Sequence, residues 1–460
     1  MGAFADVDRG EGATLPRGLG VLRSLGAFQR TVATILATAA LAGSGIGASA
    51  QEIPGSFDTL RVVSEDAAMP YAVWVAWSPL IVPAHDGAAW AFFSAETKEN
   101  GEIVGTKRLY TSRFDPATAK WTPATAMQGG EIQFGPSAVL DADGQVHLVF
   151  TDRPTGEDDS FGSIIYTSTN GEGGWETPTA IAPLDTAGHQ LSPNLAIDNS
   201  GGLHVAWQDQ RGVDEANRLA SAANADIFAS DRGANGTWSK PVQINKRPGP
   251  EVNASRPHLV VDGDRILALW SIYEVPVGLE TATRIEWSTR PLGDADGWAA
   301  PKALIERGES QMGGRLLDLS SNPGGGATLV YGRRIGETNE LFLRRIDAGA
   351  ASWGADIAVG SGDKGSFPTL AVGPDGISYV VYNIGSGTSV QVGAIAVAAG
   401  ATAAGPEVIV TQGEEGAQGR AAINVDQSGA LWVVYFHEPV GSASNAVRVL
   451  RGLQLPVNAG

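Results

Sequence analysis

The sequence predicts an all-β fold, a β-propeller of seven four-stranded blades, because one hairpin pattern recurs and long amphipathic helices are missing after the N-terminal region. The clearest hairpin covers residues 192–211, in which alternating apolar residues flank the turn 198–202. Period-two alternation around an Asp/Asn/Gly cluster is typical of a β-hairpin. The pattern occurs seven times, at spacings of roughly 45–65 residues, and such a period is typical of propellers, solenoids and arrays.

Each repeat is expected to hold four antiparallel strands, which is the blade of a propeller. The other six hairpins begin at Leu80, Gly135, Ser255, Arg315, Phe367 and Gly419, and those at Leu80 and Arg315 are weaker. Third strands are expected at 163–168, 225–230 and 284–288, and fourth strands at Trp121, Trp175, Trp238, Trp298 and Trp353. Two β-sandwich domains are the alternative, which the even phasing of the seven units disfavours.

The two ends of the chain are expected to complete one blade together. The last repeat reaches only a third strand, Ala446–Leu453, while Phe57–Ser64 reads as a strand without a hairpin of its own. Placing this N-terminal strand on the last blade would close the ring and cover two sheet edges that would otherwise invite aggregation. Six blades, with the first copy as an appendage, is the second choice.

The first 50 residues have the pattern of a secretory signal peptide with an extended positively charged region. The apolar run 31–41 follows Arg23 and Arg30 and ends at small residues, which predicts cleavage after Ala50. Residues 51–460 are then expected to form a single propeller domain, secreted or periplasmic. No later stretch is apolar enough to cross a bilayer.

Composition excludes several classes of function. The 460 residues contain no cysteine, which excludes disulfides and thiolate-bound metals. The formal charge of −18 disfavours nucleic acid and anionic membranes as partners, since both require a basic face. The six histidines are scattered and no acidic spacing matches a metal-binding loop, so neither a metal nor a cofactor is expected.

The junctions between third and fourth strands resemble the Asp-box of sialidases and related propellers, Ser-x-Asp-x-Gly-x-x-Trp. The segment from Ser168 to Trp175 has the right length, with Asn170 in place of Asp, and the segment from Ser230 to Trp238 is one residue longer. The resemblance covers nearly the whole chain after residue 50 at the level of repeats. It implies a sialidase-like propeller in which these boxes are structural turns, on the face away from the active site.

Arginines gather where the opposite face is expected. Loops that enter the first strand and leave the second strand of each blade share one face around the central channel, where binding sites lie. Arginine forks bind carboxylates bidentately, so a ring of arginines points to an acidic ligand. Arg256, Arg315 and Arg420 precede first strands, and Arg153, Arg211, Arg333 and Arg334 follow second strands.

The sialidase resemblance implies arginines that hold the substrate carboxylate, a Tyr–Glu pair that supplies the nucleophile, and an Asp that donates the proton. Ser255-Arg256-Pro257 is similar to the family's Arg-Ile-Pro motif. The roles transfer to Tyr273 as nucleophile, Glu274 as its base and Asp209 as proton donor. The expected substrate-binding residues are Arg211, Arg256, Arg315 and Arg420.

Other polar residues have structural interpretations. The turn aspartates are expected to cap turns, and His147 and His204 to be packing positions. His189 and His437, on the loop face, would instead suit proton abstraction beside a uronate carboxylate. The turn aspartates are Asp141, Asp198, Asp262 and Asp426.

Two classes of function stay open. One is an enzyme on acidic glycans, preferably a sialidase-like glycoside hydrolase and otherwise a polysaccharide lyase. The other is a non-catalytic propeller that binds a glycan or a protein partner. Propellers host both classes, and the arginine ring with the export signal favours a carbohydrate-active role.

Overall fold

The computed structural model consists of β-strands, and no α-helix occurs in the ranges that it describes, as an all-β prediction requires. None of these ranges holds a helix long and apolar enough to cross a membrane. The structure describes residues 58–61, 71–73, 78–99, 102–155, 161–170, 173–182, 188–211, 225–233, 235–245, 252–274, 281–282, 284–305, 312–313, 317–335, 338–360, 367–385, 389–438, 440 and 446–458.

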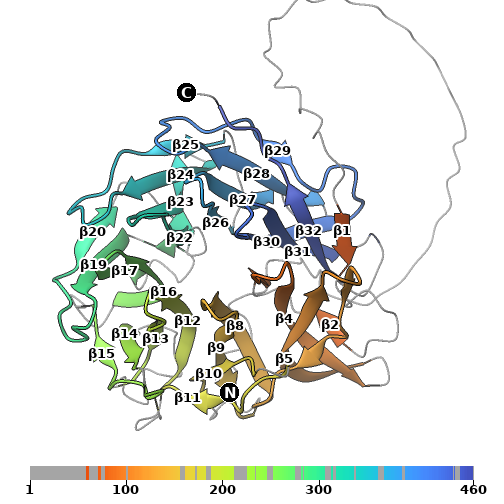
Figure 1. The fold of residues 1–460 in the computed structure, drawn as a ribbon, viewed down its shortest axis with the longest axis horizontal. Helices are drawn as coiled ribbons and strands as arrows, with labels where there is room; N and C mark the ends of the chain where they lie inside the picture. The colour runs from red at the N-terminus through yellow and green to blue at the C-terminus, as the bar shows by residue number, and fades with distance from the viewer. Residues whose placement is uncertain are drawn as a thin grey trace, which may run out of the picture.

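The sheets are arranged around a central opening, and the first strand of each predicted repeat lies next to it (Figure 1). Apolar side chains alternate with polar ones along these strands, so each strand can pack against the sheets on both sides. The inner strands are β3 (Leu80–Pro83), β8 (Ile132–Leu140), β12 (Gln190–Ile197), β16 (Val252–Asp262), β22 (Leu317–Ser321), β26 (Thr369–Val372) and β30 (Ala417–Val425).

Each inner strand pairs antiparallel with a second strand, and the second strand pairs with a third. The second strands are β4 (Ala89–Glu99), β9 (Val146–Arg153), β13 (Leu203–Asp209), β17 (Arg265–Glu274), β23 (Ala327–Ile335), β27 (Ser378–Ile384) and β31 (Leu431–Glu438). The third strands are β5 (Glu102–Asp115), β10 (Ser163–Ser168), β14 (Asp226–Arg232), β19 (Arg284–Pro291), β24 (Thr338–Ile346), β28 (Gln391–Val397) and β32 (Ala446–Leu453).

The outer strands are short, and the N-terminal one joins the C-terminal sheet. β1 (Asp58–Arg61) pairs antiparallel with β32, with Asp58 opposite Arg451, and the two strands lie side by side in Figure 1. The rest of the predicted strand Phe57–Ser64 lies outside the described residues. The other outer strands are β7 (Thr125–Ala126), β11 (Thr179–Ala180), β15 (Val242–Gln243), β20 (Lys302–Ile305), β25 (Ile357–Val359) and β29 (Val408–Ile409).

The first two predicted sheets are joined, which differs from separate four-stranded units. β5 is 14 residues long and pairs with β4 along nearly its whole length, from Phe114 opposite Ala89 to Glu102 opposite Glu99. One parallel pair, Lys107 opposite Ile132, then connects it to β8, and the Lys107 N–H donates to the Glu131 carbonyl at 2.8 Å. This contact merges ten strands, with β2 (Tyr71–Val73) on β4 and β6 (Lys120–Trp121) on β5. A separate two-stranded sheet pairs β18 (Thr281–Ala282) with β21 (Met312–Gly313).

The prediction that outer strands begin at a tryptophan is wrong by four residues at Trp175, Trp238, Trp298 and Trp353, whereas Trp121 lies in the two-residue strand β6. Trp175 and Trp238 make only single bridges to the ends of the third strands, and β11 and β15 start at Thr179 and Val242. At four of the five tryptophans a third-strand hydroxyl donates to the carbonyl of the residue that follows the tryptophan. The Ser230 hydroxyl donates to the Ser239 carbonyl at 2.8 Å. The same bond joins Ser112 to Thr122, Thr167 to Glu176 and Ser288 to Ala299.

The core lies between sheets. Seven hydrophobic clusters occur in the described part of the chain. Six of them combine residues of two neighbouring sheets, and the seventh combines the two halves of the merged ten-stranded sheet. One cluster joins Phe93 of β4 to Trp432 of β31, and so connects the first hairpin to the last. Burial of apolar area is the main source of folding stability, so each sheet depends on its neighbours.

The tryptophans before the outer strands belong to these interfaces. Trp238 packs edge-on against Tyr166 of the preceding sheet, with ring centroids 5.4 Å apart. Trp353 does the same against Trp287, at 6.1 Å. These geometries are the ones that aromatic pairs prefer, and they give the tryptophans a structural role.

Replacing Trp238 with alanine should therefore destabilise the protein without touching the channel. We expect the free energy of unfolding to fall by about 3 kcal/mol, as for large aromatic residues in cores. Urea denaturation followed by circular dichroism measures the change. Val457→Ala is the matched control, because Val457 is 41% exposed; equal stability of the two variants would contradict the packing role.

Candidate functional site

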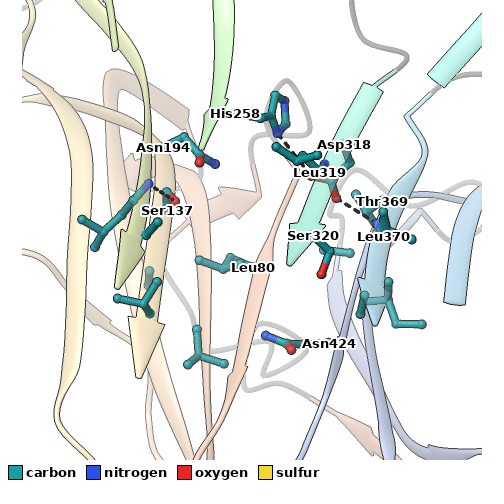
Figure 2. A pocket seen from close by; sticks show the side chains of 18 of the residues that line it. Leu80, Ser137, Asn194, His258, Asp318, Leu319, Ser320, Thr369, Leu370 and Asn424 are labelled. Carbon is teal, nitrogen blue, oxygen red and sulfur yellow. Dashed lines mark hydrogen bonds and ion pairs between the residues drawn. The ribbon is translucent and has the colours of Figure 1, made fainter. Parts of the chain in front are cut away.

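The inner strands enclose a channel with a cavity volume of about 690 Å³, to which all seven of them contribute residues. Polar side chains and leucines face each other across it (Figure 2). The ionisable residues among those that line it are His85, Arg256, His258, Asp318, Arg420 and Asp426. Two of the predicted arginines, Arg256 and Arg420, are therefore at the channel.

One end of the channel is formed by a repeated backbone irregularity. Non-glycine residues rarely have positive φ, yet Ser192, Arg256, Phe367 and Arg420 have φ values of 52–64° and Gly135 has 63°. Strand registers shift at four of these positions, as in β-bulges. Bulges re-aim side chains. We call these five residues, which all line the channel, the bulge ring.

Arg420 is held by two contacts. Its guanidinium carbon lies 3.6 Å from the centroid of the Phe367 ring, a close cation–π contact. Its backbone N–H donates to the Asn383 side-chain oxygen at 3.0 Å. The guanidinium is thus fixed at the channel end by a neighbouring bulge-ring residue rather than extended freely.

Arg256 lies beside Tyr273, the predicted nucleophile. Tyr273 is only 3% exposed, and burial raises the pKa of its phenol although the nearby Arg256 and Ser271 act in the opposite direction. The phenol is thus neutral at ordinary pH. Tyr273 itself is not part of the channel lining.

Asp209 and Arg211 lie away from the channel and pair with each other. Asp209 is 1% exposed and accepts from the Trp207 indole N–H at 2.7 Å and from the Arg211 guanidinium at 2.6 Å. Arg211 also covers the Phe228 ring, at 4.4 Å. The structure therefore does not bring these two predicted site residues to Arg256 and Arg420.

Two predicted site residues cannot be placed in the same way. Arg315 lies outside the described residues. Glu274 is the last residue of β17, opposite Val252, and only its backbone is described. Of the seven predicted residues, the structure brings Arg256, Tyr273 and Arg420 to or beside one end of the channel.

A belt of polar side chains, missed in the sequence, joins successive inner strands. Asn194 of β12 accepts from the Leu259 N–H of β16 at 2.8 Å, and Asp318 of β22 accepts from the Leu370 N–H of β26 at 2.8 Å. Asn424 of β30 donates to the Ile81 carbonyl of β3 at 3.1 Å. The same kind of bond joins Ser137 to Leu195 and Thr369 to Ala421. In four repeats a proline follows the bulge-ring residue, and a polar residue follows that proline. This pattern was the available signal for Ser137, Asn194, His258 and Thr369.

His258 is the ionisable member of this belt. Its Nδ1 lies 3.3 Å from an Asp318 carboxylate oxygen, and its side chain is 19% exposed. Figure 2 shows the two side chains facing each other between β16 and β22. The Asp318 carboxylate also accepts from the Leu319 N–H at 2.8 Å, so it holds a fixed orientation beside the imidazole.

The turn aspartates cap their turns, with one exception. Asp198 accepts from the backbone N–H groups of Ser200 and Gly202 at 2.7 and 2.9 Å, and Asp141 and Asp426 bond equivalent groups. Asp262 instead pairs with Arg265 and reaches the Gly326 N–H of the next sheet. The capping prediction is thus confirmed at three of the four residues.

The two second-strand histidines are more than packing residues. His204 lies between two carboxylates, with nitrogen–oxygen distances of 3.1 Å to Asp198 and 2.8 Å to Asp231. His147 bonds the Tyr166 hydroxyl at 2.8 Å. These contacts satisfy buried polar atoms, and no group of three or more potential metal ligands occurs in the described ranges.

His437 and His189 are both buried, His437 beside Glu414 at 3.4 Å and His189 against Phe161. The His189 Nδ1 accepts the Gly162 backbone N–H at 3.1 Å. Burial, helped by the charge of Arg153, lowers the pKa of His189 from 6.5 to about 4. Protonation would break the bond to Gly162, so the folded protein favours the neutral ring.

This shift makes stability depend on pH. In the unfolded protein His189 binds its proton near pH 6.5, and in the folded protein only near pH 4. The contribution of neutral His189 to the free energy of unfolding is therefore fully present above the unfolded pKa. It should fall by about 2–3 kcal/mol as the pH drops between these values. His189→Gln keeps an acceptor for Gly162 and should remove this part of the pH dependence in urea denaturation, whereas His85→Gln should keep it. Identical pH profiles for the His189 variant and the parent would contradict the assignment.

Solved structures resemble this arrangement, although no family model and no curated protein matches the sequence. A fungal alcohol oxidase of the AA5 family superposes with a TM-score of 0.53 at 14% identity, over 87% of this chain and 76% of that one. The polysaccharide lyase Uly1 gives 0.50 at 12%, over 85% and 91%. The fold is a β-propeller. A protein of unknown function from Dyadobacter fermentans gives 0.49 at 11%, over 84% and 96%. At such identities, the likeness to known propellers extends to the fold alone.

Proposed function

We propose that this β-propeller is a secreted, carbohydrate-active protein that binds acidic glycans at the bulge-ring end of its channel. The observation that carries the proposal is the placement of Arg256 and Arg420 in equivalent left-handed positions at one channel end. Guanidinium groups bind carboxylates through paired hydrogen bonds. Two of them on different sheets suit a sugar that carries a carboxylate.

The negative charge of the whole chain implies that an acidic sugar is attracted only close to the two arginines. With a formal charge of −18, the protein repels anions at long range. An acidic sugar would be attracted only within about 10 Å of the arginines, the screening distance at moderate salt. The stacked Arg420–Phe367 pair adds preorganisation, which lowers the entropic cost of binding.

Cleavage of the glycan is the second proposal, and one observation favours it: Tyr273 lies beside Arg256. A sialidase-like reaction would use Tyr273 as nucleophile, Glu274 as base and Asp209 as acid. The buried ion pair of Asp209 with Arg211 and the raised pKa of Tyr273 both oppose that assignment. Binding without cleavage is therefore the function that the geometry supports better, and lyase chemistry stays an outcome of the assay below.

We also propose that residues 51–460 form one ring of seven blades, closed by β1, after removal of the first 50 residues. Seven inner strands, the β1–β32 pairing and the cluster that joins Phe93 to Trp432 support this architecture. Asn424 adds a hydrogen bond to Ile81 across the same junction.

Deleting residues 51–66 tests the closure. The truncated protein should expose the edge of β32, and aggregate or melt well below the parent, because exposed edges pair with other chains. Differential scanning calorimetry and size-exclusion chromatography measure both effects. Replacing residues 62–66 with a Gly/Ser linker, which leaves β1 in place, is the control. An unchanged melting temperature of the deletion variant would show that the ring closes otherwise.

Conservative changes of the two channel arginines test the binding site. Arg256→Lys and Arg420→Lys keep the charge but lose the paired donors, so each should weaken binding of an acidic sugar about tenfold. Calorimetric titration with trigalacturonate and with sialyllactose measures the loss, and neutral maltotriose should not bind. Arg211→Lys, away from the channel, is the matched control.

The same protein should be tested for turnover, with a fluorogenic sialoside and with polygalacturonate. Fluorophore release would move the proposal to a hydrolase, and an unsaturated product would move it to a lyase. Binding that survives both channel-arginine changes would overturn the site. A protein ligand would then be the remaining alternative.

A further inference from the structure

We propose that His258 is a third, protonatable cation of this site, so that protonation of its imidazole tightens the binding of an anionic glycan. The inference rests on the proposed function and adds its regulation by pH. The geometry behind it is the pairing of His258 with Asp318 inside the channel, next to the bulge ring.

His258 lies close to Arg256 in the chain and in the channel. It follows the bulge residue by two positions on β16, and both residues line the cavity. The equivalent belt residues of the two preceding sheets, Ser137 and Asn194, do not ionise and bond the backbone of the next strand. At His258 the partner is instead a carboxylate, Asp318. Among the belt contacts in the described residues, only the one between His258 and Asp318 joins two ionisable groups.

Asp318 is a positioning residue that keeps its charge in the channel. Its two oxygens accept from the backbone N–H groups of Leu319 and Leu370, both at 2.8 Å. The carboxylate therefore cannot turn away when His258 loses its proton. Its negative charge would then oppose an anion that approaches Arg256 and Arg420.

The charges at this end of the channel give the sign of the effect. Among the lining residues, His85 and Asp426 belong to hairpin turns at the other ends of β3 and β30, while the belt residues of β12 and β26 carry no charge. Among the described lining residues, this end therefore holds two arginines and one carboxylate, a net charge of 2 − 1 = +1 with neutral His258 and +2 with the protonated form. An anion favours the protonated form, so binding should take up a proton and weaken as the pH rises.

Calorimetric titration of trigalacturonate into the mature protein tests this coupling. The carboxylates of the ligand stay ionised between about pH 5 and about pH 8, so the protein carries any change. The affinity of the parent should be roughly threefold to tenfold higher at the lower pH, which is the effect of one added charge at partly screened distance. Titrations in two buffers of different ionisation enthalpy, at a pH between these limits, should show proton uptake.

The test variants take their replacement side chains from other positions of the belt. His258→Asn installs the side chain of the preceding sheet, so the belt keeps a hydrogen-bonding group and loses the titration. This variant should bind with a flat pH profile, near the affinity of the parent at high pH. Asn194→Ser, which installs the residue of the sheet before, is the matched control and should keep the slope of the parent.

A second variant covers the case in which His258→Asn does not fold. Asp318→Asn removes the opposing charge, so it should bind more tightly than the parent at about pH 8, by a similar factor. A pH slope retained by folded His258→Asn, or no gain in Asp318→Asn, would overturn the role of His258 while leaving the arginine site intact. Absence of trigalacturonate binding by the parent at every pH, or binding that survives the arginine changes, would overturn both proposals.

Discussion

Contact between neighbouring sheets is the constraint on which the rest of this protein depends. Every hydrophobic cluster in the described residues is shared by two sheets or by the two halves of the merged sheet, and the chain has no cysteine to add covalent links. A single four-stranded sheet with two apolar faces is unstable in water. The channel is a consequence of this packing, because the inner strands converge on one axis and the belt side chains hold their backbones in register.

The bulge ring turns this structural repeat into a candidate site. Each bulge shifts the register of an inner strand at the same channel end, and the local sequence decides what is presented there. Gly135 has no side chain and Ser192 has a short one, whereas Arg256 and Arg420 carry a charge and Phe367 carries an aromatic ring. Left-handed conformations of such residues cost energy, which surrounding contacts must offset. The hydrogen bond from the Arg420 N–H to Asn383 is one such contact.

The sequence was sufficient for features that depend on local pattern. β10 and β32 have the predicted bounds, and the turn aspartates are where alternation and turn composition put them. Features that depend on long-range contacts could not be predicted from the sequence. The hydrogen bond from Asn424 to Ile81, for example, joins residues that are 343 positions apart in the chain. Asp209 shows the same limit for the site: its position after a second strand suggested the loop face, but its direction is set by Trp207 and Arg211. Ser230 opens an Asp-box-like segment in the sequence, but its bond to the Ser239 carbonyl is seen only in the structure.

Burial of charge separates structural from functional ion pairs in this fold. Asp209 is the last residue of β13 and Arg211 follows it by two positions, and they contact Trp207 and Phe228, so their charges offset each other at the end of one strand. Breaking such a pair leaves an uncompensated buried charge, which is costly, and the pair therefore stabilises a single arrangement. His258 and Asp318 come from different sheets and are partly exposed to the channel. Their carboxylate is already satisfied by two backbone N–H groups, so the imidazole is not required to hold it. The fold therefore does not require a charge on this imidazole, and a negatively charged ligand would favour the form that carries one.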